Sequence, residues 1–384
     1  MSYGEATVKD QPIDTHLASD KKPALEKYFE AAVSMGASDI HLKGNAVPRM
    51  RVGGHLRETT GSAIPEQKLE EMIFEVLSPD QKKFFLAHGA IDLAYDLSKK
   101  DRFRVNFFRQ RRLVSMAARH VTSIIPPFES LYLPPVVEQI ADFHQGLVLV
   151  TGVTGSGKST TIASMLNHIN MNRACHIITV EDPIEFIYED GKALVSQREV
   201  GVDVPSFDEA LRSFMREDPD VVLVGEIRDY TTLSAGLKAA ETGHLVFATL
   251  HSTDPYQTVT RVLDLTPQVE RHMIRQALVG NLKGVISQRL LPTIREKPKR
   301  VPAVEILIVN ASARKLIAEE REMDLITVIK NSYGDGMIDF TESLRQLVEK
   351  EFIDLKTAYA YATNPDELKM AMKGIRNAAA GIIG

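Results

Sequence analysis

Apolar and polar residues in the first third of the chain follow helical spacing in some segments and strand-like spacing in others. From Pro23 onwards, apolar positions recur every third or fourth residue, which predicts an amphipathic helix ending near Gly36. A second helix is expected over residues 66–77, and Gly53-Gly54 predicts a hairpin turn. The expected strands cover residues 40–42, 48–52, 55–58, 91–97, 102–108 and 113–120. We predict a flexible leader over residues 1–22 and a sheet-centred α+β domain over residues 23–121.

The pattern changes after a segment with four prolines, residues 122–135, which we interpret as a domain linker. Beyond it, short apolar runs alternate with helical patterns, as is typical of a parallel sheet buried on both faces. These runs cover residues 147–151, 177–180, 221–224 and 245–250. The last hundred residues are mostly helical in spacing, and Asn364-Pro365-Asp366 predicts the start of a final helix. We assign residues 136–384 to one α/β domain with C-terminal helices.

Composition narrows the class of protein. The 384 residues are 44% hydrophobic and 25% charged, which excludes a mainly disordered chain. The single cysteine, Cys175, excludes an intramolecular disulfide and a cysteine-based structural zinc site, and it favours a reducing, cytoplasmic environment. No apolar run approaches the roughly 18 residues that span a bilayer. The net charge of −5 gives no reason to expect nucleic acid as a partner.

The strongest chemical signal is GVTGSGKS, residues 152–159, which matches G-x-x-x-x-G-K-[ST] between a predicted strand and a predicted helix. Glycines let backbone N–H groups point at phosphate oxygens, and the helix N-terminus adds a favourable dipole. We expect Lys158 to bind the β- and γ-phosphates of ATP and Ser159 to bind Mg²⁺. The expected nucleotide-binding residues are Gly152, Thr154, Gly155, Ser156, Gly157, Lys158, Ser159 and Thr160.

A second signal is the apolar run over residues 221–224, which ends in Gly225 and Glu226. We expect this strand to lie beside the P-loop strand, so that its terminal carboxylate faces the phosphates. Gly225 occupies the position at which such strands usually carry a metal-binding aspartate. Glu226 is therefore expected to hold Mg²⁺ through water or to activate the attacking water. The alternative is a surface glutamate at a strand end.

Glu181, Asp182 and Glu185 follow the run over residues 177–180. Three carboxylates beside a P-loop are costly to gather without a cation, so a metal-binding or water-orienting role is expected. A solvated turn, with Asp182 as a helix cap, is the alternative.

Two histidines flank the run over residues 245–250. We expect His251, at the carboxyl end of this strand, to sense the γ-phosphate. For either His244 or His251, a hydrogen-bonded structural role is the alternative.

Six arginines lie within residues 101–120: Arg102, Arg104, Arg109, Arg111, Arg112 and Arg119. A nucleic-acid face is one interpretation, but the strand spacing of Phe103, Phe107 and Phe108 favours a core over base stacking. Arginines outside the nucleotide domain can instead reach the γ-phosphate of a neighbouring subunit. A solvated strand face is the third interpretation.

Taken together, these segments resemble the secretion ATPase (GspE/PulE) superfamily, specifically the type IV pilus retraction (twitching motility) ATPases of the PilT and PilU type. The resemblance covers residues from about 23 to 368. It rests on the P-loop and on ASDIHL from residue 37, RFRVN from 102, EDPIEF from 181, QREV from 197, REDPD from 216, GEIRD from 225 and AETGH from 240 through His251.

The resemblance implies an α/β protein with a PAS-like N-terminal α+β domain and a RecA-like P-loop ATPase domain with a helical C-terminal tail. It implies ATP hydrolysis with Mg²⁺, coupled to pilus retraction by a homo-hexamer with nucleotide between subunits. Glu181 and Glu226 would handle metal and water, His251 would read the γ-phosphate, and Arg104 and Arg119 would contact nucleotide. The implied location is peripheral, at the cytoplasmic face of the inner membrane. The implied partners are the pilus platform protein and, as an open alternative, a paralogous retraction ATPase.

Some features bear on the branch of the family. Pilus-extension relatives commonly carry a four-cysteine zinc module, which one cysteine cannot form. Residues 312–319, SARKLIAE, keep part of the retraction motif AIRNLIRE, with Ala318 where its second arginine is expected. Residues 285–292 and the length favour a PilU-like paralogue, so principal and accessory motors both stay open. The competing functions are a RecA-like ATPase acting on nucleic acid and a nucleotide-binding structural subunit with negligible turnover.

Overall fold

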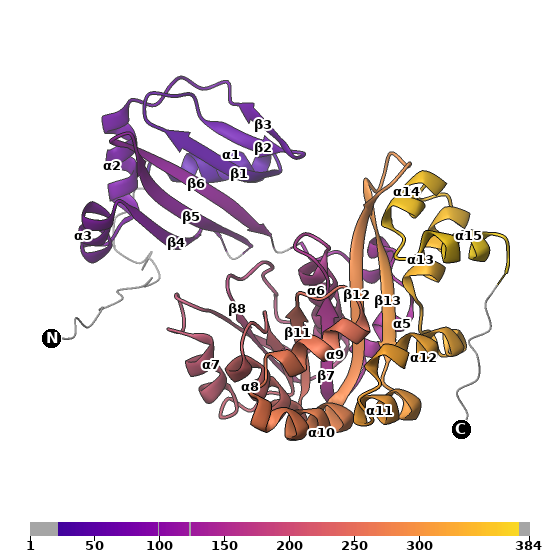
Figure 1. The fold of residues 1–384 in the computed structure, drawn as a ribbon. Helices are drawn as coiled ribbons and strands as arrows, with labels where there is room; N and C mark the ends of the chain where they lie inside the picture. The colour runs from indigo at the N-terminus through magenta and orange to yellow at the C-terminus, as the bar shows by residue number, and fades with distance from the viewer. Residues whose placement is uncertain (1–21, 99, 123, 376–384) are drawn as a thin grey trace. The chain divides into compact units, whose positions relative to one another are not determined.

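The computed structural model describes residues 22–98, 100–122 and 124–375 (Figure 1). The chain divides into two compact units. The first contains the described residues up to Ile124, together with the segments Pro183–Glu189 and Arg198–Ser206. The second contains Ile125–Asp182, Asp190–Gln197 and the described residues from Phe207 onwards. Except for its last residue, the leader expected over residues 1–22 lies outside the described residues.

A six-stranded antiparallel sheet forms the centre of the first unit, in the order β3-β2-β1-β6-β5-β4. The strands are β1 (Ala37–Lys43), β2 (Arg49–Val52), β3 (His55–Glu58), β4 (Ala90–Asp96), β5 (Asp101–Gln110) and β6 (Leu113–Thr122). The helices are α1 (Glu26–Ser34), α2 (Glu66–Val76) and α3 (Pro79–His88). Side chains alternate along β5, so that Phe103 and Phe107 are buried while Arg104 is exposed. These phenylalanines therefore belong to the core, as their spacing predicted.

The helices and strands predicted for this unit are confirmed, but α3 was missed. The second helix was expected to end at residue 77, and no helix was predicted directly after it. In the structure, Ser78 caps α3 through a reciprocal pair of hydrogen bonds with Gln81, and Pro79 occupies the first helical position. The S-x-x-Q spacing with proline at the first helical position was the sequence signal for this helix.

A seven-stranded sheet forms the centre of the second unit, in the order β13-β12-β7-β11-β10-β8-β9. The strands are β7 (Gly146–Thr151), β8 (His176–Glu181), β9 (Leu194–Glu199), β10 (Val221–Val224), β11 (Leu245–Leu250), β12 (Leu282–Pro292) and β13 (Arg300–Ile308). Strands β8, β10, β11, β7 and β12 pair in parallel, whereas β13 is antiparallel to β12. The two segments of the first unit that follow Asp182 include the last two residues of β9.

Helices accompany this sheet and contribute to its cores. They are α4 (Phe128–Leu131), α5 (Val136–Ala141), α6 (Lys158–Asn172), α7 (Phe207–Phe214), α8 (Tyr230–Glu241), α9 (Pro255–Asp264), α10 (Arg271–Asn281), α11 (Ala311–Ala318), α12 (Leu325–Asn331), α13 (Phe340–Glu349), α14 (Leu355–Tyr361) and α15 (Pro365–Met372). One core joins the inner strands to α7–α12, and another joins β12 and β13 to α13–α15 (Figure 1). Among the residues described, none of these helices combines the length and apolar character that crossing a bilayer requires.

The expectation that the strand before Glu226 lies beside the P-loop strand is wrong. Strand β11 lies between β7 and β10, with Phe247 opposite Val148 on one side and Leu223 on the other. Strand order depends on the path of the crossover connections, and an apolar run does not reveal that a later strand enters between two earlier ones. The carboxyl end of β11, which leads to His251, therefore lies between the P-loop and Glu226.

The expectation that the last hundred residues are mostly helical is wrong for β12 and β13. Both strands are buried along most of their length, so they lack the alternation of a half-exposed strand. The final helix is confirmed: the side chain of Asn364 caps α15 by accepting hydrogen bonds from the N–H groups of Asp366 and Glu367. The predicted α/β fold class, with one sheet in each unit, is confirmed.

Candidate active site

The loop between β7 and α6 has the backbone geometry of an anion-binding cradle. Gly152, Gly155 and Gly157 adopt positive φ angles of 144°, 78° and 93°. A Cβ at Gly152 would lie 2.4 Å from the main-chain oxygen of Gln288, so no other residue fits there without a shift. Helix α6 begins directly after the loop, at Lys158, and its first N–H groups have no acceptor within the helix. The backbone N–H groups of the glycine loop and of the N-terminus of α6 are therefore available as donors to phosphate oxygens.

Two side chains of the loop match a phosphate ligand in charge and hydrogen bonding. The Nζ atom of Lys158, whose residue is 9% exposed, donates to the main-chain oxygens of Gly152 (2.8 Å) and Val153 (3.2 Å). The Oγ atom of Ser156 is buried and has no hydrogen-bond partner within the described chain. Phosphate oxygens would satisfy both the ammonium and the orphaned hydroxyl. The residues present therefore fit a nucleoside polyphosphate.

The other expected loop residues surround this cradle. Thr154 and Gly155 are exposed, whereas Ser159 and Thr160 are partly buried in the first turn of α6. Ser159 comes directly after Lys158 in the first turn of α6, which is the position of the Mg²⁺-binding hydroxyl in P-loop proteins.

Glu226 lies at the centre of a polar cluster after β10. The Nη2 atom of Arg228 is 2.6 Å from one carboxylate oxygen, and the Nε2 atom of His251 is 3.1 Å from the other. Burial raises the pKa of Glu226, but the hydrogen bond and charge of Arg228, with His251 and Lys158, outweigh burial and hold this pKa below its ordinary value. Glu226 is therefore ionised at neutral pH, in the form that can orient water or a hydrated cation.

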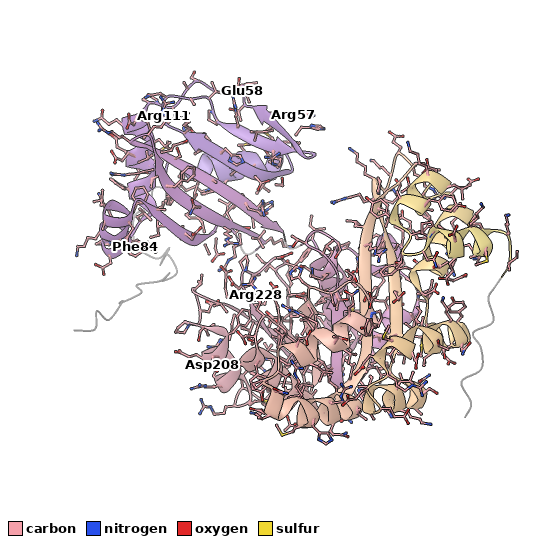
Figure 2. All side chains as sticks on the ribbon, viewed as in Figure 1. Arg57, Glu58, Phe84, Arg111, Asp208 and Arg228 are labelled. Atoms are coloured by element: carbon pink, nitrogen blue, oxygen red, sulfur yellow. The ribbon has the colours of Figure 1, made fainter. Side chains whose placement is uncertain are left out.

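Arg228, labelled in Figure 2, connects this cluster to the end of β8. Its Nη1 atom lies 3.5 Å from the Oδ2 atom of Asp182. Sequence reasoning missed this arginine, although it stands within the GEIRD segment. A cation two residues after the strand-end glutamate was the available signal.

Gly225 is explained by the close approach of two strand ends. Its N–H donates to the main-chain oxygen of Val180 at 2.8 Å, and a Cβ at Gly225 would lie 3.1 Å from that oxygen and 3.2 Å from the Cα atom of Glu181. The hydroxyl of Thr249 also donates to the main-chain oxygen of Gly225 at 2.5 Å. A larger side chain would push β10 away from β8, so Glu226 is the first carboxylate after the strand.

The three carboxylates that follow the run over residues 177–180 have different surroundings. Glu181 is 9% exposed, and it accepts hydrogen bonds from Thr179 at 2.7 Å and Gln197 at 3.3 Å. Asp182 is exposed and pairs with Arg228, whereas Glu185 lies in the segment that belongs to the first unit. Glu181 and Asp182 therefore have separate partners, and the metal-binding or water-orienting role expected of these carboxylates stays a prediction.

Within the described part of the chain, no group of three His, Cys, Asp or Glu side chains is placed to hold a metal ion. Mg²⁺ usually keeps several waters and takes one or two carboxylates together with substrate phosphates. Ser159, Glu226 and Glu181 therefore suit a cation that arrives with the nucleotide, not a preformed protein cage.

The two histidines at the ends of β11 have different surroundings. The Nδ1 atom of His244 lies 2.9 Å from the main-chain oxygen of Ala239 and 3.0 Å from the hydroxyl of Thr242, which gives it the structural role named as its alternative. His251, at the other end, contacts Glu226, and its side chain is 47% exposed. Only His251 is brought into the cluster around the P-loop.

Arg104 and Arg119 lie in the first unit, directly opposite each other on β5 and β6. The Nε atom of Arg119 is 2.9 Å from an oxygen of Asp39, while 74% of the arginine side chain stays exposed. Two other arginines of this stretch are also paired: Arg102 with Asp96 and Glu199, and Arg109 with Glu70. The arginine cluster is therefore partly neutralised by acids of its own unit.

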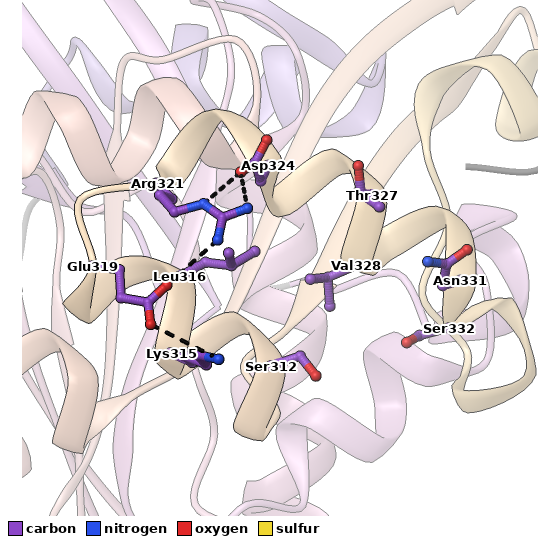
Figure 3. A pocket seen from close by; sticks show the side chains of 10 residues that line it. All are labelled: Ser312, Lys315, Leu316, Glu319, Arg321, Asp324, Thr327, Val328, Asn331 and Ser332. Carbon is purple, nitrogen blue, oxygen red and sulfur yellow. Dashed lines mark hydrogen bonds and ion pairs between the residues drawn. The ribbon is translucent and has the colours of Figure 1, made fainter. Parts of the chain in front are cut away.

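Residues 312–319 form α11 and the start of the following turn, and they line a cavity of about 270 Å³ (Figure 3). Its charged side chains pair with one another: Lys315 with Glu319, and Arg321 with Glu319 and Asp324. Ala318 is exposed, so the absence of an arginine there changes surface charge and not the packing of the helix.

Comparisons with known proteins agree with this geometry. Residues 134–359 match the family described as type II/IV secretion system protein. The chain is 41% identical over 335 residues to the type IV pilus retraction ATPase PilT of Pseudomonas aeruginosa, covering 87% of this chain and 97% of that protein. The chain belongs to the type IV pilus retraction ATPases. The chain described here is also 34% identical over 349 residues to the type IV pilus ATPase PilU of Pseudomonas aeruginosa, and the match covers 91% of each chain.

A crystal structure of the pilus retraction motor PilT with bound ADP has the same fold as the retraction ATPase described here. The TM-score is 0.83 at 40% identity, and the match covers 91% of this chain and 99% of that one. The recognised family and the ATPase activity are thereby confirmed, whereas binding of the nucleotide at the P-loop stays a prediction.

Proposed function

We propose that this ATPase is a homo-hexameric motor that hydrolyses ATP to drive retraction of a type IV pilus. The observation that carries the proposal is the joint placement of Lys158, Glu226 and His251 at the ends of β7, β10 and β11, in a chain that matches a retraction ATPase over nearly its whole length. The order β7-β11-β10 places these three strand ends at one edge of the sheet.

The residues divide the chemistry among themselves. Lys158 and the N–H groups of the loop bind the β- and γ-phosphates, and Ser159 holds Mg²⁺, which neutralises phosphate charge when bound. Glu226, ionised and held by Arg228, orients the water that attacks the γ-phosphorus while the bond to the β-phosphate oxygen breaks. His251 contacts Glu226 and reads the γ-phosphate, and Glu181 assists through water and metal.

Arg104 and Arg119 act in a neighbouring subunit within this proposal. Both arginines belong to the unit that does not contain the P-loop, and both side chains are exposed. A cation supplied in trans makes hydrolysis depend on assembly of the ring. The hexamer, the platform protein of the pilus as partner and the cytoplasmic face of the inner membrane as location complete the proposal.

Identity to PilT exceeds identity to PilU, 41% against 34%, which favours a principal motor. Ala318, in place of the second arginine of the retraction motif, is the observation that favours an accessory motor. Deletion of the gene and measurement of retraction force separate the two. Loss of retraction is expected, and retraction at full force would assign the accessory role.

The proposed function is tested by measuring phosphate release from the purified protein with and without DNA. DNA is expected to leave the rate within about twofold, because Arg102, Arg109 and Arg119 of the arginine cluster are paired with acids. Strong stimulation by DNA, together with unimpaired twitching of the deletion strain, would overturn the pilus assignment in favour of a nucleic-acid motor.

A further inference from the structure

Gln288, on β12, contacts both ends of the P-loop, although it stands far from the loop in sequence. The residue is 3% exposed, and its Oε1 atom accepts a hydrogen bond from the hydroxyl of Thr161 at 2.9 Å. A Cβ at Gly157 would lie 2.8 Å from its Nε2 atom, and a Cβ at Gly152 would lie 2.4 Å from its main-chain oxygen. One residue therefore lies against the first glycine, the last glycine and the first turn of α6.

The register of the sheet explains how Gln288 reaches this place. Strand β12 runs parallel to β7, with Ser287 opposite Thr151, and the hydroxyls of these two residues are 2.8 Å apart. Thr151 is the last residue of β7, whereas β12 continues to Pro292. Gln288 is thus the first residue of β12 beyond the stretch that pairs with β7. It lies at the level where β7 ends and the P-loop begins.

The contacts of Gln288 occur where the loop has no side chains of its own. Glycines give the P-loop the backbone angles that it needs, but they leave it without packing atoms at Gly152 and Gly157. Pre-oriented donors bind phosphate better than donors that must reorganise, because the ordering is completed before the ligand binds. The side-chain amide of Gln288 lies against Gly157 and is hydrogen-bonded to α6, and the main-chain oxygen of the same residue lies against Gly152.

We propose that Gln288 is a positioning residue that holds the P-loop in its phosphate-binding shape, with Thr161 as the partner that fixes its amide. The proposal rests on the phosphate-binding role proposed for the loop. Gln288 itself does not contact the reacting atoms; it acts through the backbone of Gly152 and Gly157. Its loss is therefore expected to weaken nucleotide binding and turnover without removing any group that binds phosphate.

The experiment uses the full-length protein and measures ATP turnover and binding of a fluorescent ADP analogue. Gln288→Met keeps the length of the side chain but loses the acceptor for Thr161. We expect kcat/KM for ATP to fall about tenfold and the ADP dissociation constant to rise about fivefold, as for loss of one buried hydrogen bond that orients a site. Thr161→Val is expected to cost about threefold, and Thr161→Ser, which keeps the hydroxyl, is expected to behave like the wild type.

Coupling between the two residues is read from the double variant. Because both single changes remove the same hydrogen bond, Gln288→Met combined with Thr161→Val is expected to be no worse than Gln288→Met alone. Fully additive losses in kcat/KM would show that the two side chains act separately, and they would overturn the proposed partnership.

Ser343→Ala is the matched control, because it removes a buried hydrogen bond from the N–H of Val304 on β13, the strand beside β12. It is expected to lower the melting temperature while leaving kcat/KM within twofold. If Gln288→Met behaves in the same way as this control, Gln288 is a packing residue and the proposal fails. If Gln288→Met does not fold, the difference between Thr161→Val and Thr161→Ser decides, and equal activities would reject the proposal.

Lys158→Ala separates failure of this inference from failure of the proposed site. Loss of turnover in Lys158→Ala with an unchanged Gln288→Met would reject only the positioning role. Full turnover in Lys158→Ala would reject the phosphate-binding role of the loop itself.

Discussion

The two units place their polar side chains in different ways. In the second unit, the parallel strands β7, β11 and β10 end at one edge of the sheet, and Lys158, His251 and Glu226 follow those ends. In the first unit, the antiparallel strands β5 and β6 carry Arg102, Arg104 and Arg119 on one face, where Glu199 pairs with Arg102 and Asp39 pairs with Arg119. A parallel sheet gathers side chains at a single edge, whereas an antiparallel sheet distributes them over a surface.

This difference explains why similar charges have different uses. Arg228 holds Glu226 ionised beside the P-loop, within reach of the charge of Lys158. Arg119 pairs with Asp39 at the surface of the first unit, where most of the arginine side chain stays exposed to solvent. We therefore expect large effects on catalysis from the strand ends of the second unit, and small effects on stability from the strand face of the first.

The largest effect is expected from Lys158→Ala. In the proposed mechanism the ammonium of Lys158 binds the transferred phosphate. Phosphate release is therefore expected to fall by roughly a hundredfold or more. The measurement is steady-state ATPase activity, with Lys192→Ala, an exposed lysine of the same unit, as the control. Activity within tenfold of the wild type would contradict the convergence of catalytic groups at this sheet edge.

Glu226→Gln is expected to lower kcat about a hundredfold while the ADP affinity changes less than about threefold, because the carboxylate acts on water and not on the bound phosphates. Single-turnover measurements separate binding from chemistry. Glu241→Gln, at the exposed end of α8, is the matched control and should retain full activity. A large loss of affinity with unchanged kcat would show that Glu226 binds and does not activate.

Arg104→Ala is expected to lower ATPase activity about tenfold at protein concentrations where the ring assembles, and to leave ADP binding by dilute protein unchanged. Arg57→Ala, which removes an exposed arginine from β3 of the same sheet, is the control (Figure 2). An equal effect of both changes would mean that the arginine face has no specific role, and the comparison between the units would become sharper.

A smaller effect concerns the stability of the second unit as a function of pH. Burial raises the pKa of Glu305 to about 8, with Asp339 and Asp254 adding to the rise. The folded protein thus binds a proton that the unfolded chain releases, so this group's contribution to stability is full below about pH 4.5 and declines as pH rises towards 8. Glu305→Gln is expected to stabilise the protein by about 2 kcal/mol at pH 8, but not at pH 4, in urea denaturation. An equal gain at both pH values would contradict this assignment.

The smallest effect is expected from Asp39→Asn. Burial raises the pKa of Asp39, but hydrogen bonds from Ser38 and Arg119 and the charges of Arg119 and Arg51 outweigh burial and lower it. Its contribution to stability is therefore present above the unfolded pKa and is lost as pH falls through the folded pKa. A loss of less than about 1 kcal/mol at pH 7 is expected by urea denaturation. A much larger loss would mean that the strand face of the first unit holds that unit together.

Much of the site could be predicted because its residues form local motifs. The spacing of GVTGSGKS defines loop and helix start at once, and an apolar run followed by Glu226 defines a strand end. Arg228 and Gln288 could not be assigned in the same way. Their roles depend on which strands become neighbours. A cation two residues after Glu226 was a signal for Arg228, but nothing local links Arg228 to Asp182 or Gln288 to the loop.

The amino-acid sequence by itself determined most of the elements, the P-loop motif and the family of this protein, because spacing and motif chemistry act over a few residues. The tertiary structure decided that β11 enters between β7 and β10, that Asp182 after β8 pairs with Arg228 after β10, and that Gln288 of β12 lies against the loop. These outcomes depend on the pairing of strands far apart in the chain, where side-chain packing and crossover path select the neighbours. Local sequence pattern therefore specified the strands and loops that carry Lys158, Glu226 and His251, and long-range pairing specified the order of those strands in the sheet.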